Sequence, residues 1–343
     1  MRVDVPSPAE LNGAKVWTEA TFSLGGREHS CVVSGGNMVW QADQEITRVT
    51  GLVIPAKPGG IDVIGAGLVG SDGHRVRLTG HAATARRLWA WPIGTFHSAK
   101  TSLNGPKITC ELKSLNALVA EHQGVTPVGV GKASRISWVV GGILAEDHID
   151  LLVDADLAEQ TVPTDFTIGT DRAAALKELM TAWGAQLVPD PSGAMRAMKL
   201  ETDPITSVAV TFSGAETMID APMELTRDGV FNHIVIDLKD EVGVAQAVQT
   251  EGQYGVERFG WRTKRVQSDA IVSAAQGTLV AKTELAKALR RTITVPVETL
   301  PDWRIQPFEA VGVTTDKTRW GRVTGIDRPL VGGSMVFHVG MEV

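Results

Sequence analysis

The amino-acid sequence predicts an α+β, multidomain protein in which two β-rich domains flank a small α/β domain. The chain has 343 residues, more than a single hydrophobic core usually serves, so we expect two or three domains. Segments with strand periodicity occupy both ends of the chain, and segments with helical spacing occupy its middle. These observations divide the chain into residues 1–124, 125–206 and 207–343.

The first domain, residues 1–124, consists of one strand-like segment after another. The hairpin signal Gly25-Gly26 separates a loosely alternating segment, 14–24, from the apolar segment 29–33. Further strands are expected at 38–41, 46–54, 61–64, 74–79, 89–97 and 107–112. A short segment with helical spacing then runs to Gly124, where we place the end of this domain.

The middle domain, residues 125–206, contains the helical segments. We expect one helix over 138–154 and a second, clearer helix from Asp171 to Trp183. Thr170 can cap the second helix, Asp171 suits its first turn, and Gly184 supplies the stop. Its apolar stripe consists of Leu176, Leu179, Met180 and Trp183. A hairpin with strands at 186–188 and 195–200 completes the predicted domain.

The third domain, residues 207–343, is again β-rich but carries one long helix. That helix is predicted from Ser268 to Arg290. Its expected buried positions are Ile271, Ala275, Leu279, Leu285 and Leu289. Strands are expected at 208–212 and 233–238 before the helix, and at 292–295, 310–314 and 335–339 after it.

Composition excludes several classes of protein. The net charge is −6 with acidic and basic residues interspersed, so no basic stripe indicates sequence-specific nucleic-acid binding. Apolar runs such as 137–145 are shorter than the roughly 20 residues of a membrane span, and the N-terminus lacks the apolar core of a secretory signal. Cys31 and Cys110 are too few for a disulfide framework, so each is predicted to be a buried thiol.

Two segments resemble cofactor-binding motifs, but the residues around them do not match those motifs. Residues 65–70 satisfy G-x-G-x-x-G, but a strand follows where a dinucleotide site needs a helix, so a hairpin loop is the better interpretation. Residues 129–132 lack the earlier Gly and the following Ser or Thr of a phosphate loop. We therefore predict no cofactor site.

Catalytic and metal-binding patterns are absent from the sequence as well. The histidines form neither H-x-x-x-H nor H-E-x-x-H, and the acidic residues around His148 suit a solvated helix face. No G-x-S-x-G elbow occurs. A glycosidase carboxylate pair stays open, because such a pair arises from fold geometry and has no fixed spacing. We predict no catalytic residues, no metal site and no enzyme.

Tryptophan usage is unusual, with nine Trp against a single Tyr. Trp89 and Trp91 share the i, i+2 face of a predicted strand, which is the geometry of a sugar-stacking platform. The alternative, which we favour, is that both rings fill one side of a sheet or a subunit interface. Trp89 and Trp91 are therefore the candidate interface or glycan-stacking residues.

Five loose patterns follow one another in a characteristic order. They lie at 73–118, 171–193, 228–236, 300–311 and 320–330. In this order they resemble the hub family of bacteriophage tails, the baseplate hub or tail-tip minor tail proteins. The chain departs from the family where Glu309 replaces the usual Asp and where Trp320 precedes Gly321.

This resemblance implies a fold and a role. It implies two tail-tube-like β domains per chain, of the barrel or sandwich-plus-helix type. Three chains would then form a ring, a homotrimeric hub that joins the tail tube to the tip and surrounds the DNA path during ejection. The implied partners are the distal tail protein, the tape-measure protein and the tip or fibre proteins, without a membrane segment or cofactor. The implied location is the virion tail tip, after assembly in the host cytoplasm.

The resemblance also bears on catalysis and leaves two alternatives. Larger family members continue into C-terminal hydrolase domains, whereas this chain ends at Val343, so the implied role is structural. A hexameric distal-tail ring protein is one alternative. A cell-wall glycan-binding module or glycosidase at the tail tip is the other.

Overall fold

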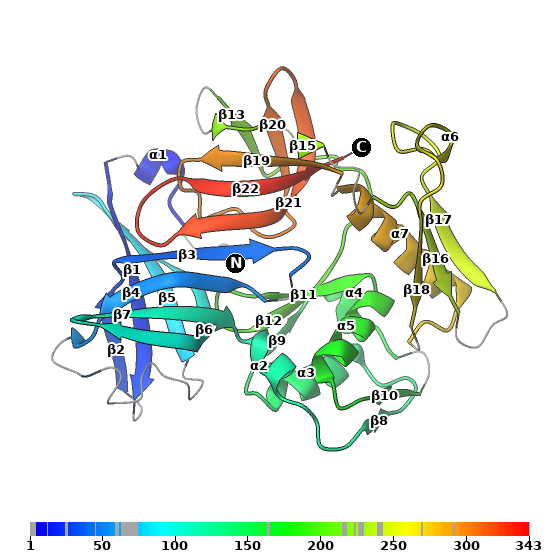
Figure 1. Ribbon diagram of the computed structural model, residues 1–343, viewed down its shortest axis with the longest axis horizontal. Coiled ribbons are helices and arrows are strands. Elements are labelled where there is room, and N and C mark those ends of the chain that lie inside the picture. The colour runs from blue at the N-terminus through cyan, green and yellow to red at the C-terminus, as the bar shows by residue number, and fades with distance from the viewer. Residues whose placement is uncertain are drawn as a thin grey trace.

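The α+β, multidomain fold class is confirmed by the computed structural model. It describes residues 5–11, 13–24, 27–44, 46–58, 62, 75–162, 165–214, 218–222, 224–225, 230–238, 243–268, 270–290 and 292–342. Figure 1 shows blue and cyan strands at the left, red and orange strands above them, a green α/β region below, and a yellow sheet with the long helix at the right. The hairpin signal Gly25-Gly26 and the glycine motif at 65–70 lie outside the described residues, as does the predicted strand at 61–64 apart from residue 62.

The N-terminal strands form a closed barrel. They are β1 (Lys15–Leu24), β2 (Arg27–Val32), β3 (Gly35–Gln41), β4 (Arg48–Pro55), β5 (Arg75–Ala83), β6 (Leu88–Asn104) and β7 (Lys107–Ser114). They pair in the order β3-β4-β7-β6-β5-β1-β2. The corner between β2 and β3 closes the ring, because the Val33 amide bonds to the Thr18 carbonyl and the Ser34 amide to the Val53 carbonyl, at 2.9 and 2.8 Å. Closure leaves few unpaired backbone groups at the sheet edges.

The C-terminal strands extend the same sheet. They are β13 (Val210–Ser213), β14 (Met218–Asp220), β15 (Glu224–Leu225), β19 (Ile293–Thr299), β20 (Ala310–Thr314), β21 (Thr318–Pro329) and β22 (Met335–Met341). Strand β21 pairs with β20 along its first half and with β3 along its second half, from Gly325↔Gln41 to Pro329↔Asn37. The two β-rich ends of the chain therefore belong to one 14-stranded sheet.

Strand β21 is absent from the predicted elements, although it joins the two halves. Its sequence, TRWGRVTGIDRP, contains four charged side chains and two glycines, which obscure the alternation of a strand. Its buried positions nevertheless alternate along most of its length, because successive side chains of a strand point to opposite faces of the sheet. It pairs with β22 on one side and with β20 and β3 on the other. Tertiary pairing here outweighs a weak local pattern.

The middle of the chain forms the α/β region. Its elements are α2 (Asn116–Glu121), β8 (Val128–Val130), α3 (Ile136–Ala145), β9 (Leu151–Val153), α4 (Ala155–Ala158), β10 (Phe166–Ile168), α5 (Arg172–Ala182), β11 (Ala185–Pro189) and β12 (Met195–Lys199). Strands β11 and β12 form the predicted hairpin, and β9 joins β12 in parallel. Strands β8 and β10 make a separate pair.

The prediction of one helix over 138–154 is wrong at its C-terminal half. Helix α3 ends at Ala145, and residues 151–153 form strand β9. His148 adopts a left-handed conformation, with φ of 54°. The Ile149 amide bonds to the Leu144 carbonyl and the His148 amide to the Ala145 carbonyl, which makes a Schellman motif with His in the place usually held by Gly. The sequence offers no glycine there to announce the stop.

Helix α5 forms where it was predicted, but its cap differs. The N-cap residue is Asp171, whose Oδ1 accepts a hydrogen bond of 2.9 Å from the Ala174 amide, so the assignment of Thr170 as cap is wrong. Gly184 supplies the stop with φ of 60°. The predicted stripe of Leu176, Leu179, Met180 and Trp183 is buried.

A second small sheet carries the long helix. Its elements are β16 (His233–Asp237), β17 (Val244–Val248), α6 (Val256–Phe259), β18 (Thr263–Gln267) and α7 (Ala274–Arg290). Helix α7 packs against β16 and β17 (Figure 1). Its buried positions are Gly277, Val280, Ala281, Thr283, Leu285 and Ala288. The predicted start of this helix at Ser268 is wrong, because residues 270–273 are not helical and α7 begins at Ala274. The predicted burial of Ala275 and Leu279 is also wrong, and Leu289 is half-buried, whereas Leu285 and Ile271 are buried as predicted.

Buried side chains fall into two clusters, each drawn from separated parts of the chain. One fills the large sheet and combines residues of β1–β7 with residues of β13 and β19–β22. The other lies among the helices and combines residues of α2–α5 and β8–β12 with residues of β16, β17 and α7. The division into 1–124, 125–206 and 207–343 stays a prediction.

Candidate functional site

A segment between β19 and β20 packs against β6 of the N-terminal barrel. We call this segment, Leu300–Glu309, the strap. Trp303 and Ile305 of the strap are buried, with 6% and 0% of their surface exposed. The Trp303 ring lies against Trp91 of β6, with 5.6 Å between ring centroids. The strap therefore packs the C-terminal half of the chain onto the inner face of the barrel.

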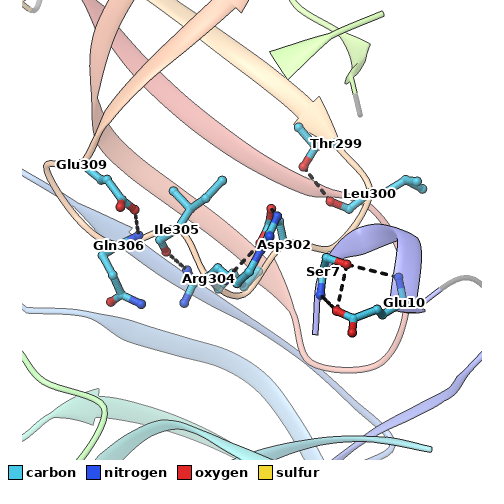
Figure 2. Close-up of polar contacts among 10 residues, drawn as sticks. Ser7, Glu10, Thr299, Leu300, Asp302, Arg304, Ile305, Gln306 and Glu309 are labelled. Atoms are coloured by element: carbon cyan, nitrogen blue, oxygen red, sulfur yellow. Dashed lines mark hydrogen bonds and ion pairs between the residues drawn. The ribbon is translucent and has the colours of Figure 1, made fainter. Parts of the chain in front are cut away.

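Charged groups hold the strap in its conformation (Figure 2). Asp302 is 3% exposed, and its carboxylate accepts bonds from Arg304 Nε and Nη2 at 2.9 and 2.6 Å. Arg328 of β21 donates from Nη2 to the Ile305 carbonyl at 2.5 Å, and its guanidinium lies 5.3 Å from the Trp303 ring centroid. At its end, the Gln306 amide bonds to Glu309 Oε2 at 3.0 Å.

Arg328 is a buried cation that no carboxylate of the described residues contacts directly. Only 6% of it is exposed. Burial lowers the pKa of Arg328 to about 10, against a smaller opposing effect of Asp302, so the group stays charged at neutral pH. Its Nε atom has no hydrogen-bond partner among the described residues. Burial of a cation costs free energy, and the hydrogen bond to the Ile305 carbonyl together with the Trp303 ring compensates part of that cost.

The short helix α1 (Pro8–Leu11) lies beside the strap, as Figure 2 shows. Ser7 donates from its amide and its hydroxyl to Glu10 Oε2, at 2.8 and 2.9 Å, and the Glu10 amide donates to Ser7 Oγ at 3.3 Å. This is a capping box. The hydrogen bonds from Ser7 lower the pKa of Glu10, and Arg87 and Arg304 lower it further.

A cavity of about 750 Å³ opens between the strap, β6 and the β11–β12 turn. Its volume is within the usual range for ligand sites. Pro92, Pro189, Pro191 and Pro307 supply rigid apolar walls, which carry no amide donors of their own. Its charged lining consists of Arg196, Arg304, Arg328 and Asp190.

Three buried side-chain atoms of this lining have no hydrogen-bond partner among the described residues, and all three are donors. They are Trp91 Nε1, Trp303 Nε1 and Arg328 Nε. The Trp91 indole edge lies against Gly80, because a Cβ built on Gly80 would be 2.5 Å from Trp91 Nε1. Trp303 Nε1 and Arg328 Nε are likewise covered by the protein itself.

A second cavity, of about 630 Å³, lies between helices α2 and α5 on one side and α7 and β18 on the other. Its charged groups are paired within the chain. Lys264 and Lys287 contact Glu284 at 2.8 and 2.9 Å, and Arg265 contacts Asp237 at 2.6 Å. Burial alone would raise the pKa of Glu284, but the two lysines lower it. Lys264, Lys287 and Arg265 in this cavity are thus in ion pairs, whereas Arg328 beside the strap donates to the neutral carbonyl of Ile305.

The structure places the predicted residues Trp89 and Trp91 inside the protein. Both lie on the inward face of β6, with 6% and 2% of their surface exposed. Arg87 also lies over the Trp89 ring, at 5.1 Å from its centroid. Neither ring has a free face for a sugar in this conformation, so the placement favours the structural interpretation of the pair. A role at an interface or in glycan stacking stays a prediction.

Trp303 and Arg328 are not among the site residues predicted from the sequence. Both lie within the family-like patterns at 300–311 and 320–330, but neither pattern shows that the two side chains meet. A usable signal was the pair Pro301 and Pro307, which interrupts a β-rich region with a segment that cannot join a sheet centre.

Three further observations concern the cysteines, the possible metal ligands and the helices that could cross a membrane. Cys31 and Cys110 are free and buried, as predicted, and burial raises the pKa of each thiol to about 11. Within the described ranges, no group of three or more His, Cys, Asp or Glu side chains is arranged to hold a metal ion. Of the described helices, none has both the length and the apolar character to cross a membrane.

Comparisons with known proteins find likeness in structure alone. No protein-family model matches the chain, and no curated protein matches it. The 43 kDa tail protein of prophage MuSo2 from Shewanella oneidensis has a TM-score of 0.63 at 12% identity, over 95% of this chain and 100% of that one. The tail protein from Neisseria meningitidis MC58 has a TM-score of 0.62 at 12% identity, over 96% of both chains.

A third neighbour comes from a secretion system. It is the E. coli c3393 protein, a component of the type VI secretion system described as structurally similar to the T4 bacteriophage tail proteins gp27 and gp5. Its TM-score is 0.54 at 10% identity, over 96% of this chain and 77% of that one. The predicted likeness to phage tail hub proteins is thus confirmed as a likeness of fold.

Proposed function

We propose that this chain is a structural subunit of a phage-type tail, and that it forms the hub ring at the tail tip. The observation that carries the proposal is the extent of the fold match. A prophage tail protein and a second tail protein align over 95% and 96% of this chain and over 100% and 96% of their own lengths. The match thus includes the barrel, the α/β region and the C-terminal sheet together.

The architecture supports a load-bearing role. Pairing of β21 with β3 joins the two β-rich ends of the chain through backbone hydrogen bonds, and the strap packs between them. A subunit built in this way presents one stiff block, which suits a ring that must hold its shape during DNA ejection. We propose that this block surrounds the DNA path and contacts the distal tail, tape-measure and tip or fibre proteins.

Exposed apolar side chains and strand edges are available for subunit contacts. Several large apolar side chains are strongly exposed, among them Leu88, Trp138 and Trp261, at 66%, 74% and 63%. Among the described strands of the large sheet, β2, β13, β14 and β15 each pair with a single neighbour. Strand edges and exposed aromatic groups of this kind are usually covered by neighbours in closed rings. The proposed ring is a homotrimer without catalytic activity, located at the tail tip of the virion.

Mass photometry of the purified chain tests the ring. The hub predicts a species of three times the chain mass of 36.6 kDa. A hexamer would instead favour the distal-tail ring protein, and a monomer at micromolar concentration would contradict the proposal. Lysis of purified cell walls by the chain would overturn the non-catalytic part and favour a tail-tip glycosidase.

A further inference from the structure

The cavity between α2, α5, α7 and β18 contains two lysines that share one carboxylate. Lys264 Nζ donates to Glu284 Oε2 at 2.8 Å, and Lys287 Nζ donates to Glu284 Oε1 at 2.9 Å. All three residues line the cavity, and its volume of about 630 Å³ is usual for a ligand site. Among the described residues, Glu284 is the single acceptor bonded to either ammonium group, so this group of three carries one excess positive charge.

A ligand can reach the two ammonium groups. The side chains of Lys264 and Lys287 are 41% and 30% exposed. Each ammonium carries three donors, and one of them is bonded to Glu284. An anion in the cavity would accept bonds from the other donors and balance the excess charge. Hydrogen bonds between charged groups are about twice as strong as those between neutral groups, so an anion is favoured over a neutral acceptor.

The remaining charged lining also favours an anion. Lysine and arginine contribute four lining residues, and aspartate and glutamate contribute two. Arg265 pairs with Asp237, which is not part of the lining, and three basic residues then still stand against two acidic ones. The whole chain, in contrast, has a net charge of −6. The cavity is therefore a basic site in an acidic protein, and its local field attracts negatively charged ligands.

Two strand edges indicate that the anion is carried by an extended peptide. Among the described strands, β18 pairs only with β16, and β11 pairs only with β12. Consecutive residues of both strands, 264–267 and 185–187, line the cavity. Side chains of a strand alternate between two faces, so consecutive lining residues place the backbone edge itself at the cavity. Free strand edges bind extended peptides through main-chain hydrogen bonds, and Val119, Leu176 and Met180 supply apolar contacts beside them.

We propose that this cavity binds an extended acidic segment of another protein. The segment adds to the edge of β18 and places a carboxylate between Lys264 and Lys287, while its apolar side chains contact Leu176 and Met180. The site goes beyond the proposed function and does not depend on it, since binding is tested without reference to the ring. A free small carboxylate shares the same chemistry, and the experiment separates the two sources.

The test follows the methionine methyl signals of the full chain by ¹H–¹³C NMR, because Met180 lines the cavity. The probe is acetyl-Val-Glu-Val-Glu-Val-amide at constant ionic strength, compared with its Gln counterpart, with glutarate and with tetrathymidylate. The Glu peptide should shift the Met180 signal in a saturable manner, and Met180→Leu assigns that signal. Met335 is fully buried in the core of the large sheet and should not respond.

Three substitutions test the charges. Lys264→Gln and Lys287→Gln each remove one ammonium group and leave Glu284 paired with the other. Each should weaken binding of the Glu peptide by roughly two- to tenfold, as loss of one hydrogen bond does. Glu284→Gln removes the competing carboxylate and should instead tighten binding by roughly two- to tenfold, which general damage to the fold would not do. Lys282→Gln is the matched control, because Lys282 lies on the same helix but is exposed and outside the lining, and it should leave binding unchanged.

Two N-methylated peptides test the pairing with β18. One carries the methyl group on the amide of the central valine, and the other carries it on the amide of the second glutamate. Amides of successive residues in a strand point to opposite sides, so only one of these amides can face β18. One peptide should therefore bind roughly tenfold more weakly than the other. Equal binding overturns the strand pairing.

Each remaining outcome also decides the proposal. Absence of a saturable Met180 shift overturns the site. Equal binding of the Gln peptide, or weaker binding by Glu284→Gln, overturns the role of the lysine pair. Tighter binding of glutarate or of tetrathymidylate than of the Glu peptide overturns a protein segment as the source of the anion. If one lysine variant does not fold, the other lysine variant and the peptide series decide the same question.

Discussion

Gly80 on β5 is a position where a single methyl group should have a large effect. Gly80 pairs with Trp91 of β6 in the register of the two strands. A Cβ built on Gly80 would lie 2.4 Å from Trp91 Cε2 and 2.6 Å from Cζ2. Carbon atoms prefer about 3.5–4.0 Å, so Gly80→Ala requires the indole to move by roughly 1 Å.

The indole has little room to move. Trp91 is 2% exposed, and the ring of Trp303 lies behind it at 5.6 Å between centroids. A displaced Trp91 ring therefore pushes against Trp303 of the strap. The strap is fixed nearby by the hydrogen bond from Arg328 to the Ile305 carbonyl. We expect Gly80→Ala to destabilise the large-sheet core by about 1–3 kcal/mol, the usual cost of overpacking a well-packed interior.

Gly142→Ala is the matched control, because it adds the same methyl group where there is space. Gly142 lies inside helix α3 and has no atom within 4 Å of a built Cβ. Alanine in a helix interior loses less conformational entropy on folding than glycine does. This variant should therefore stabilise α3 by about 0.5–1 kcal/mol.

Hydrogen exchange measured by mass spectrometry suits both variants, because it reports the local opening of each core separately. Peptides from β5 and β6 should lose about five- to 150-fold in protection in Gly80→Ala, while peptides from α3 should gain protection in Gly142→Ala. Unchanged exchange of β5 and β6 in Gly80→Ala would refute the close packing of Trp91 on Gly80. A loss in both variants would point to a general effect of alanine instead.

Three further predictions concern single groups. Asp171→Ala should destabilise helix α5 by about 1 kcal/mol, because it removes the N-cap bond, whereas Thr170→Ala should have little effect; thermal unfolding distinguishes them. His148→Gly should stabilise α3 by up to about 1 kcal/mol in chemical unfolding, because glycine adopts a φ of 54° without strain, and destabilisation would contradict this account. Burial raises the pKa of Cys31 and Cys110 from 9.0 to about 11, so the folded state holds these protons longer than the unfolded state does. Stability should therefore fall as pH rises from about 9 to about 11, and this slope should be smaller in the Cys31→Ala/Cys110→Ala variant, with equal slopes counting against the prediction.

Local signals in the sequence were sufficient for elements with a clear period and a clear stop. Helix α5 illustrates this, because its apolar stripe and Gly184 are both readable without a structure. Helix α3 shows the limit: its stop depends on His148 in a left-handed conformation, which no residue type announces. Strand β21 shows another limit, because its charged residues and glycines conceal a strand that is stabilised by neighbours on both sides.

The sequence by itself determined the α+β class, the β-rich ends around an α/β middle, and the ordered likeness to phage tail hub proteins. These features depend on periodicity and on order along the chain, both of which are linear. Only the tertiary structure decided that the two ends share one sheet through β3 and β21, and that Trp91, Trp303 and Arg328 meet beneath the strap. The physical reason is that strand pairing and side-chain burial depend on which distant segments become neighbours, and a local pattern does not specify that choice.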